Sequence, residues 1–286
     1  HSPEKESKVL KLKYHYAPTP GYTQVVTPET HPINDLNFGM LNLEPGQRYE
    51  AASAGYEIGL VMLAGRCSVR VDDETFADLG ERASVFEGRA SGVYVPCQSN
   101  FAVQAGAAGA EIAVCRCPTE QRFAAQVVRP ADVIVNERGG PGFKRYVHDI
   151  FGPQVQAATM LVGETYTVAG NWSSFPPHKH DVEALPDEVQ QEELYFYKIR
   201  PAEGFGLQFF YSRPDSPRGE LDEAVAVRQD DFTLMPFGCH PVAAPPGYDV
   251  YYLWFLAGPR RLMRPHDDPL YAWIKNAPAD ERSYPQ

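Results

Sequence analysis

Short apolar runs separated by turn residues recur along almost the whole chain. Residues 56–71 are apolar and β-favouring, with a Glu-Pro-Gly turn before them at 44–46 and an acidic hairpin tip after them at 72–74. Similar runs return at intervals of about 8–12 residues, with glycine, proline or aspartate between them. This spacing is typical of a β-sandwich or a β-barrel. The pattern therefore predicts an all-β fold.

The strand pattern of the first half returns in the second half. A run that ends at Pro96 corresponds to a run that ends at Pro236, and the neighbouring runs also match. The offset is about 140 residues, which indicates a duplicated unit. We expect two small β-barrels, one formed by residues 1–135 and one by residues 136–286. Within the second, residues 267–274 are expected to form a short helix that packs its tryptophan on the barrel.

Composition and charge narrow the range of partners and locations. The 286 residues are 43% hydrophobic and 22% charged, which allows a sizeable core. The net charge of −11 argues against binding to nucleic acid or to an anionic membrane through a general positive field. No apolar run approaches the roughly 20 residues of a membrane helix. The five cysteines are odd in number and irregularly spaced, which is consistent with a reducing cytoplasm.

Four residues of the second half predict a metal site. His178 and His180 are two residues apart on an extended segment, so their imidazoles point to the same side. Glu193 follows on an apolar strand, and His240 follows a Pro-x-Gly turn at 236–238. Three imidazoles and one carboxylate suit a divalent first-row metal with open positions for substrate or water. The alternative is a pair of exposed loop histidines beside a solvated glutamate.

The first half does not repeat this donor set. Asn100 stands four residues after Pro96, in the place that His240 has after Pro236, and residues 48–50 (Arg-Tyr-Glu) stand where the histidine pair would be. We therefore expect one metal site, in the second barrel, and a structural role for the first.

Several segments carry a resemblance to a known family. They are 175–181 (Phe-Pro-Pro-His-Lys-His-Asp), 192–195 (Glu-Glu-Leu-Tyr), 204–208 (Gly-Phe-Gly-Leu-Gln) and 240–244 (His-Pro-Val-Ala-Ala). The histidines and Glu193 resemble the two signature motifs of the cupin superfamily, in a bicupin chain built from duplicated double-stranded β-helix (jelly-roll) barrels. The loop between His180 and Glu193 is longer than usual, and the second motif is one residue shorter. Nearly the whole chain resembles the 5-deoxy-glucuronate isomerase family of inositol catabolism, which is related to 5-keto-4-deoxyuronate isomerase.

The resemblance implies an aldose–ketose isomerase that converts 5-deoxy-D-glucuronate to 5-dehydro-2-deoxy-D-gluconate. It implies one divalent metal ion, with zinc as the first expectation and manganese, iron or nickel as alternatives. Glu193 would be a ligand that also shuttles a proton. Strand alternation places Tyr195 and Tyr197 on the same face as Glu193, and either tyrosine is a candidate acid.

Other residues are candidates for binding the substrate, a small sugar acid. Gln208 could donate or accept hydrogen bonds, or could be a satisfied core amide, and Tyr252 could line the cavity or pack in the core. Lys144 and Arg145 follow a glycine-rich loop that could cap the cavity and bind the substrate carboxylate. The alternative is a linker with a solvated basic patch, and Arg213 and Arg228 are further cation candidates.

Two other functions use the same residues. A cupin dioxygenase would bind iron at the three histidines and the glutamate, and a non-catalytic cupin would bind a sugar acid without converting it. Apolar edges of such barrels commonly pair, so a homo-oligomer is also expected.

Overall fold

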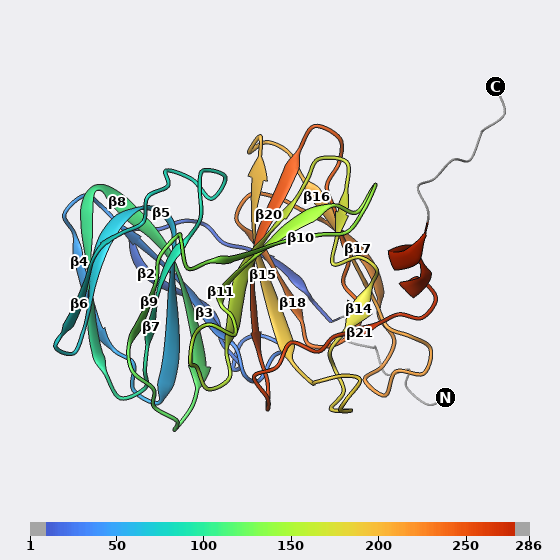
Figure 1. The fold of residues 1–286 in the computed structure, drawn as a ribbon, viewed down its shortest axis with the longest axis horizontal. Helices are drawn as coiled ribbons and strands as arrows, with labels where there is room; N and C mark the ends of the chain where they lie inside the picture. Colours follow the sequence, from blue (N-terminus) through green and yellow to red (C-terminus); the bar gives the residue numbers. More distant parts are fainter. Residues whose placement is uncertain (1–9, 278–286) are drawn as a thin grey trace, which may run out of the picture.

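The computed structural model describes residues 10–277, and their secondary structure consists of β-strands and one short 3₁₀ helix. The predicted all-β class is therefore confirmed. The chain forms two sheet assemblies side by side, the first mainly in blue to green and the second mainly in yellow-green to red (Figure 1). Within residues 10–277, no helix has both the length and the apolar character that crossing a membrane would require.

The first half is built on an eight-stranded sheet. Six strands follow the order β2-β3-β8-β5-β7-β9, while β4 pairs with β8 and β6 pairs with β5. The register between β5 and β8 shifts at two places, and such bulges bend long strands so that they close a barrel. The strands are β2 (Gly21–Val26), β3 (Asn37–Leu43), β4 (Arg48–Ala52), β5 (Tyr56–Val71), β6 (Glu74–Leu79), β7 (Ser91–Val95), β8 (Asn100–Pro118) and β9 (Gln126–Val128).

The second half contains a seven-stranded sheet in the order β1-β18-β15-β20-β12-β11-β10 and a four-stranded sheet in the order β13-β19-β16-β17. A separate two-stranded pair joins β14 and β21. The strands are β1 (Lys13–His15), β10 (Ile134–Arg138), β11 (Arg145–Phe151), β12 (Leu161–Thr167), β13 (Trp172–Ser173), β14 (His178–Lys179), β15 (Glu192–Arg200), β16 (Gly206–Tyr211), β17 (Asp222–Val227), β18 (Asp231–Met235), β19 (Val242–Ala243), β20 (Asp249–Ala257) and β21 (His266–Asp267).

The N-terminal strand does not stay with the first half. Strand β1 pairs with β18, with Lys13 opposite Thr233, so residues expected in the first barrel extend the sheet of the second. The reason is edge pairing, because β18 has an open edge whose N–H and C=O groups gain partners from β1. Strand β10 runs across the expected boundary at 135/136. The division into two barrels at that position stays a prediction.

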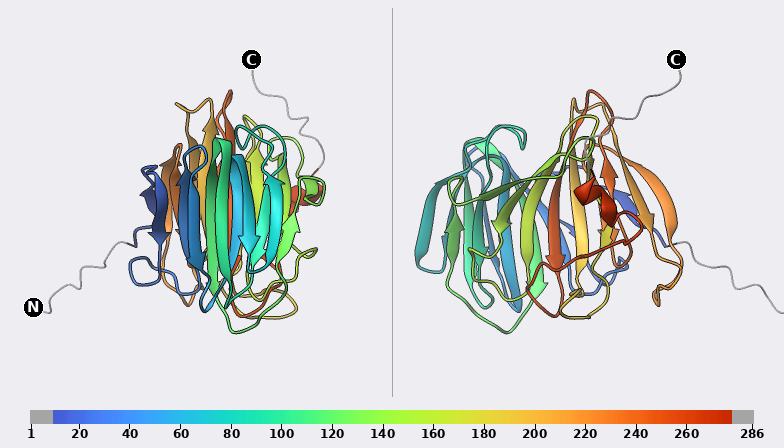
Figure 2. Two further views of the ribbon diagram at one scale, coloured as in Figure 1. Left: turned by 90° about the vertical axis from the view of Figure 1, so that its left-hand side faces the viewer. Right: turned by 45° about the vertical axis from the view of Figure 1, so that its right-hand side comes forward.

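The C-terminal helix also differs from the expectation. It is a 3₁₀ helix over Ala272–Asn276, shown in red at the outer side of the second half (Figure 2), and it contains no buried residue. Trp273 is 63% exposed and does not pack on the barrel as predicted. A short 3₁₀ turn places few side chains on any one face, so it cannot cover a core as an amphipathic α-helix does.

The largest apolar core lies between the two halves. It combines Phe38 of β3, Phe151 of β11, and Leu194 and Phe196 of β15 with many other residues from both halves. Tyr195 and Tyr197 lie in a different core, inside the second half. Since successive strand side chains point to opposite faces, β15 contributes one face to the interface between the halves and the other to the interior of its own barrel.

Buried polar groups also join the two halves. Arg82 of the first half forms an ion pair with Glu164 of β12, and the two side chains are 1% and 0% exposed. Tyr166 and Tyr251 donate further hydrogen bonds to the same carboxylate, at 3.1 and 2.8 Å. Although burial by itself would lower the pKa of Arg82, the negative charge of Glu164 outweighs this effect and raises it. The guanidinium therefore stays charged and paired inside the protein.

Loss of this pairing should destabilise the protein strongly. We expect Arg82→Met to lower the free energy of unfolding by about 3–5 kcal/mol, because Glu164 would remain buried without its counter-charge. The matched control is Arg48→Met, which breaks an exposed pair with Glu50 and should cost far less, because water screens the pair. Chemical denaturation of the two variants checks the difference. Equal losses would show that the Arg82 pair contributes no more than a surface contact.

Candidate metal centre and its cavity

Three short elements of the second half place histidines around one point. Strand β14 carries His178, His180 follows it, and β21 pairs with β14 so that His178 lies opposite Asp267. His240 follows the turn after β18. Gly238 in that turn has a φ of +86°, and a Cβ there would lie 2.8 Å from the carbonyl oxygen of Tyr211. Glycine is therefore required for the turn that delivers His240.

The Glu193 carboxylate lies at the centre of the group. Its Oε2 atom is 3.1 Å from Nε2 of His180 and 3.1 Å from Nε2 of His240. The ligand atoms of these three residues all lie within 4.8 Å of one another. His178 is slightly further out, with ring centroids 5.3 Å from His240 and 6.4 Å from His180. The structure thus brings the four residues together, with three in a tight group and the fourth beside them.

Backbone carbonyls determine which nitrogen each histidine presents. Nδ1 lies 3.3 Å from the Pro176 carbonyl in His178, 2.8 Å from the Gln191 carbonyl in His180 and 3.0 Å from the Gly238 carbonyl in His240. A carbonyl oxygen can only accept, so each Nδ1 must carry the hydrogen. The Nε2 atoms of the neutral rings then present lone pairs, as in metal sites where the outer hydrogen bond fixes the tautomer.

The electrostatics of the group favour a cation. Burial and the neighbouring imidazoles lower the pKa of His178 to about 3, so this ring is neutral near pH 7. Burial alone would raise the pKa of Glu193, but the close imidazoles of His180 and His240 outweigh it and lower the pKa to about 2. Burial alone would lower the pKa of His180, but the Glu193 carboxylate outweighs it and raises the pKa. A buried carboxylate thus lies among imidazole nitrogens, and the group favours a positive charge between them, as a proton on His180 or as a metal ion.

The orphaned atom in this group supports the same interpretation. Among the described residues, Nε2 of His240 is a buried polar atom that makes no hydrogen bond, and the residue is 1% exposed. The Glu193 oxygen 3.1 Å away does not satisfy it, because both atoms are acceptors when Nδ1 carries the hydrogen of the ring. Native proteins rarely leave such an atom unpaired unless an ion or another group satisfies it. Three imidazole nitrogens and one carboxylate oxygen are the donors that zinc, manganese, iron and nickel accept. The residues present therefore fit a divalent metal ion.

A cavity of about 460 Å³ opens beside this group. His178, His180 and Glu193 line it together with Tyr195 and Tyr252. The two tyrosine rings stack with centroids 4.1 Å apart. Burial raises the pKa of Tyr195 well above its usual value, and the nearby Glu193 charge adds to the effect, so its hydroxyl keeps its proton.

Ser174 joins the hydroxyl groups of this wall. Its Oγ lies 2.8 Å from the Tyr195 hydroxyl and 3.2 Å from that of Tyr252, and Tyr252 also donates to Ser173 at 2.9 Å. Ser174 has a φ of +48°, in the left-handed region that few non-glycine residues adopt. The surrounding structure holds this unfavourable backbone where it places the serine hydroxyl against both tyrosines.

Positive charge also lines the same cavity. Arg145 and Arg138 both line it. Burial lowers the pKa of Arg145, and within residues 10–277 no carboxylate oxygen lies within 4.0 Å of its guanidinium nitrogens. Lys144 does not line the cavity in the described structure; its side chain is 42% exposed and pairs with Glu137 at 2.8 Å. Arg213 and Arg228 are also not among the described residues that line the cavity. Of the four predicted cations, only Arg145 is therefore placed to meet a ligand in this cavity.

Two other predicted residues lie away from the cavity. Tyr197 and Gln208 are both fully buried, and the tyrosine hydroxyl donates to Oε1 of Gln208 at 2.8 Å. The amide nitrogen of Gln208 lies 3.5 Å from the His240 carbonyl. Neither residue is among those of the described chain that line the cavity. Gln208 thus corresponds to the satisfied core amide, and it supports the loop that carries His240.

Some cavity residues could not be found from the sequence. Ser174, Arg138 and Asp267 line the cavity, but no motif marks them. Asp267 arrives through the pairing of β21 with β14, which joins segments far apart in the chain. The positive φ of Ser174 is a backbone property that cannot be predicted from the presence of a serine. Only the basic residues after the glycine-rich loop offered a signal, through Arg145.

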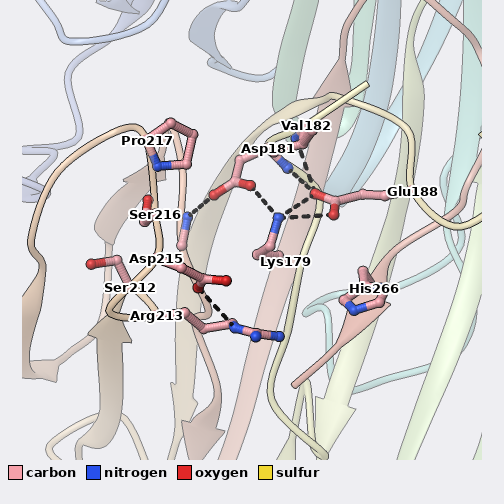
Figure 3. A pocket seen from close by; sticks show the side chains of 11 residues that line it. Lys179, Asp181, Val182, Glu188, Ser212, Arg213, Asp215, Ser216, Pro217 and His266 are labelled. Carbon is pink, nitrogen blue, oxygen red and sulfur yellow. Dashed lines mark hydrogen bonds and ion pairs between the residues drawn. The ribbon is translucent and has the colours of Figure 1, made fainter. Parts of the chain in front are cut away.

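A network of charges supports the histidine-bearing segment. Lys179 lies between Asp181 and Glu188, with Nζ–O distances of 2.6 and 2.8 Å (Figure 3). Asp181 also accepts from the backbone N–H of Gly238 at 2.8 Å. Glu188 accepts from the backbone N–H groups of Asp181 and Val182. This network therefore ties the segment of His178 and His180 to the turn that precedes His240.

Comparison with known proteins places the chain. The model of the KduI/IolB family matches residues 12–274. The 5-deoxy-glucuronate isomerase of Geobacillus kaustophilus is 37% identical over 275 residues, which are 96% of this chain and 93% of the relative. That of Lacticaseibacillus casei is 37% identical over 253 residues, which are 88% of this chain and 92% of the relative.

Solved structures agree in fold. The crystal structure of an IolB-like protein from Salmonella typhimurium has a TM-score of 0.87 and 35% identity, covering 93% of this chain and all of that one. A formate complex of oxalate decarboxylase from Lactobacillus farciminis has a TM-score of 0.66 at 14% identity, covering 94% of this chain and 91% of that one. The second likeness concerns the fold alone. The predicted duplicated cupin fold is confirmed.

Removal of Lys179 should test the supporting network. We expect Lys179→Met to lower the free energy of unfolding by about 3 kcal/mol, because Asp181 and Glu188 would lose their counter-charge in a largely buried place. Lys144→Met makes the same substitution in an exposed pair and should cost far less, because water screens the pair. Chemical denaturation measures both. A Lys179 variant as stable as the Lys144 variant would contradict the structural role.

Proposed function

The chain belongs to the KduI/IolB family, and on this premise we propose that it is a metal-dependent aldose–ketose isomerase. The proposed reaction converts 5-deoxy-D-glucuronate to 5-dehydro-2-deoxy-D-gluconate in inositol catabolism. Relatives named 5-deoxy-glucuronate isomerase, similar over nearly the whole chain, support the enzyme class. The observation that carries the proposal is a cavity lined both by metal-ligand candidates and by a half-buried arginine without a carboxylate partner among the described residues.

The metal would be held by His178, His180, Glu193 and His240. Zinc remains the first expectation, and the same donors accept manganese, iron or nickel. When bound there, a divalent ion supplies Lewis acidity that stabilises negative charge on the oxygens of C1 and C2. The low pKa of Glu193 makes this carboxylate a weak base and a good ligand, so we assign it chiefly to metal binding.

The reaction moves one proton from C2 to C1 of the substrate and shifts hydrogen between the two oxygens. Tyr195 is the better placed of the two predicted acids, because it lines the cavity and keeps its proton. The Tyr197 hydroxyl instead donates to Gln208 in the interior. Ser174 connects Tyr195 with Tyr252, and this chain of hydroxyls supports proton movement along the cavity wall.

Arg145 is assigned to the substrate carboxylate. Its guanidinium is largely enclosed by the protein and has no carboxylate partner among the described residues. A planar guanidinium binds a carboxylate through two parallel hydrogen bonds, and this interaction is strong where water is excluded. The aldehyde end of the sugar acid would then point to the metal ligands and the carboxylate to Arg145.

The cellular setting follows from the same proposal. All five cysteines are buried and unpaired in the described structure, which supports a reducing, cytoplasmic environment. The acidic net charge argues against nucleic acid and anionic membrane as partners. The homo-oligomer expected from the sequence stays a prediction.

Loss of one histidine ligand should remove both metal and activity. We expect His240→Ala to bind far less than one metal ion per chain and to lose turnover of 5-deoxy-glucuronate by at least about 100-fold, because an open ligand position weakens the whole site. Elemental analysis and a nuclear magnetic resonance assay measure the two effects. Adding zinc back to the chelator-treated wild type should restore its turnover.

A histidine outside the site is the control for this prediction. His15→Ala removes a side chain that is 61% exposed and pairs with Asp231, and it should keep metal and activity. Full turnover by metal-free His240→Ala would contradict the metal-dependent mechanism. Oxygen uptake coupled to substrate loss would favour the iron dioxygenase instead, and tight binding without conversion would favour a binding protein.

Arg145→Met should weaken selection of the acidic substrate. We expect kcat/KM for 5-deoxy-glucuronate to fall at least about tenfold, since the carboxylate would lose its charged partner. The ratio of kcat/KM for 5-deoxy-glucuronate to kcat/KM for the same sugar without the carboxylate should become smaller. The matched control is Lys144→Met, at the neighbouring residue. It should leave kcat/KM and the ratio between the two substrates near the wild-type values. An unchanged preference in Arg145→Met would show that another group binds the carboxylate.

A further inference from the structure

Each half of the chain inserts one buried carboxylate into the other half. Glu57 of β5 accepts hydrogen bonds from the backbone N–H groups of residues 158–160, at 2.6 to 2.9 Å, and from the Thr159 hydroxyl. Glu192 of β15 accepts from the backbone N–H groups of Asn34 and Asp35, at 2.6 and 3.0 Å, and from the Asn34 amide at 2.7 Å. The two contacts are reciprocal.

The strand register shows that the two glutamates are equivalent. On β5, Ile58 pairs with Val95, the residue before Pro96; on β15, Glu193 pairs with Met235, the residue before Pro236. Ile58 therefore occupies in the first half the place of the metal-ligand candidate Glu193. Glu57 and Glu192, one residue earlier, correspond to each other. The segments that they bind also correspond, because each lies just before the start of one of the equivalent strands β3 and β12.

Only one of these equivalent contacts stands beside a metal ligand. Glu192 and Glu193 are neighbours at the start of β15, so their side chains point to opposite faces of the strand. The preceding residue, Gln191, exchanges two hydrogen bonds of 2.8 Å with His180: its carbonyl accepts from Nδ1, and its N–H donates to the histidine carbonyl. Immobilising Glu192 therefore immobilises the backbone that orients both Glu193 and His180.

We propose that Glu192 is a positioning residue for the metal centre, through which the first half holds the ligands of the second. This inference rests on the metal site of the proposed function. It assigns a task to the half that lacks the ligand set: the segment at Asn34 and Asp35 fixes the start of β15, and with it the direction of the Glu193 carboxylate. Glu57 makes the same kind of contact without a ligand beside it.

The equivalence of Glu57 and Glu192 provides a matched experiment on the full chain. Glu192→Gln and Glu57→Gln each keep the side-chain shape but turn one acceptor oxygen into a donor that faces N–H groups. We expect both variants to unfold at lower temperature than the wild type. Only Glu192→Gln should weaken zinc binding, by about 10-fold or more, the size of effect expected when metal ligands lose the contacts that orient them. Glu57→Gln should change the zinc Kd less than about twofold.

Competition with a chromophoric chelator measures the zinc Kd, and thermal unfolding provides the separate stability readout. Two less disruptive variants replace the glutamine variants if those do not fold. Asn34→Ala removes one donor to Glu192, and Thr159→Ala removes one donor to Glu57. Asn34→Ala should shift the zinc Kd in the same direction as Glu192→Gln, and Thr159→Ala should leave it unchanged.

The outcomes separate this inference from the proposed function. If the wild type binds zinc and Glu192→Gln binds it equally well, the positioning role is wrong and the isomerase proposal still stands. Equal zinc binding by Asn34→Ala has the same meaning where the glutamine variant does not fold. Equal weakening by the Glu57 and Glu192 variants also overturns it, because the effect would then be general destabilisation. A wild type that binds no divalent metal ion overturns both proposals.

Discussion

Strand β15 has to satisfy two environments at once, and the rest of the molecule is arranged around that requirement. Leu194 and Phe196 face the core between the halves, while Tyr195 and Tyr197 face the interior of the second barrel. A strand buried on both faces cannot shift by one residue, since the shift would exchange every side chain between the two environments. This constraint places the Glu193 carboxylate at the histidines rather than in the interface.

The interface between the halves is both apolar and charged. Its apolar core takes side chains from both halves, and the Arg82–Glu164 pair and the two exchanged glutamates satisfy polar groups that the core encloses. A buried charge without partners is costly, so each of these groups makes the relative position of the halves specific. The first half thus contributes to the second through contacts that exist only when the two are packed together.

The groups that line the cavity indicate which kind of ligand it can bind. Its lining combines imidazole and carboxylate groups, tyrosine and serine hydroxyl groups, and an arginine without a carboxylate partner among the described residues. A ligand that carries both a carbonyl oxygen and a carboxylate matches these groups. Support for a sugar-acid substrate therefore comes from charge placement as well as from the named relatives.

Local patterns in the sequence were sufficient for the fold class, the duplication, the family and the four metal-ligand candidates. These follow from period-2 alternation, from turn residues and from short motifs, which act over a few residues. The sequence could not show that β1 joins the second half, that Trp273 stays exposed, or that Tyr197 and Gln208 bond to each other. It also could not show which cation reaches the cavity, or that Ser174 joins two tyrosines. Those features depend on which distant strand edges meet and on which buried polar groups find partners, and only the packed chain decides both.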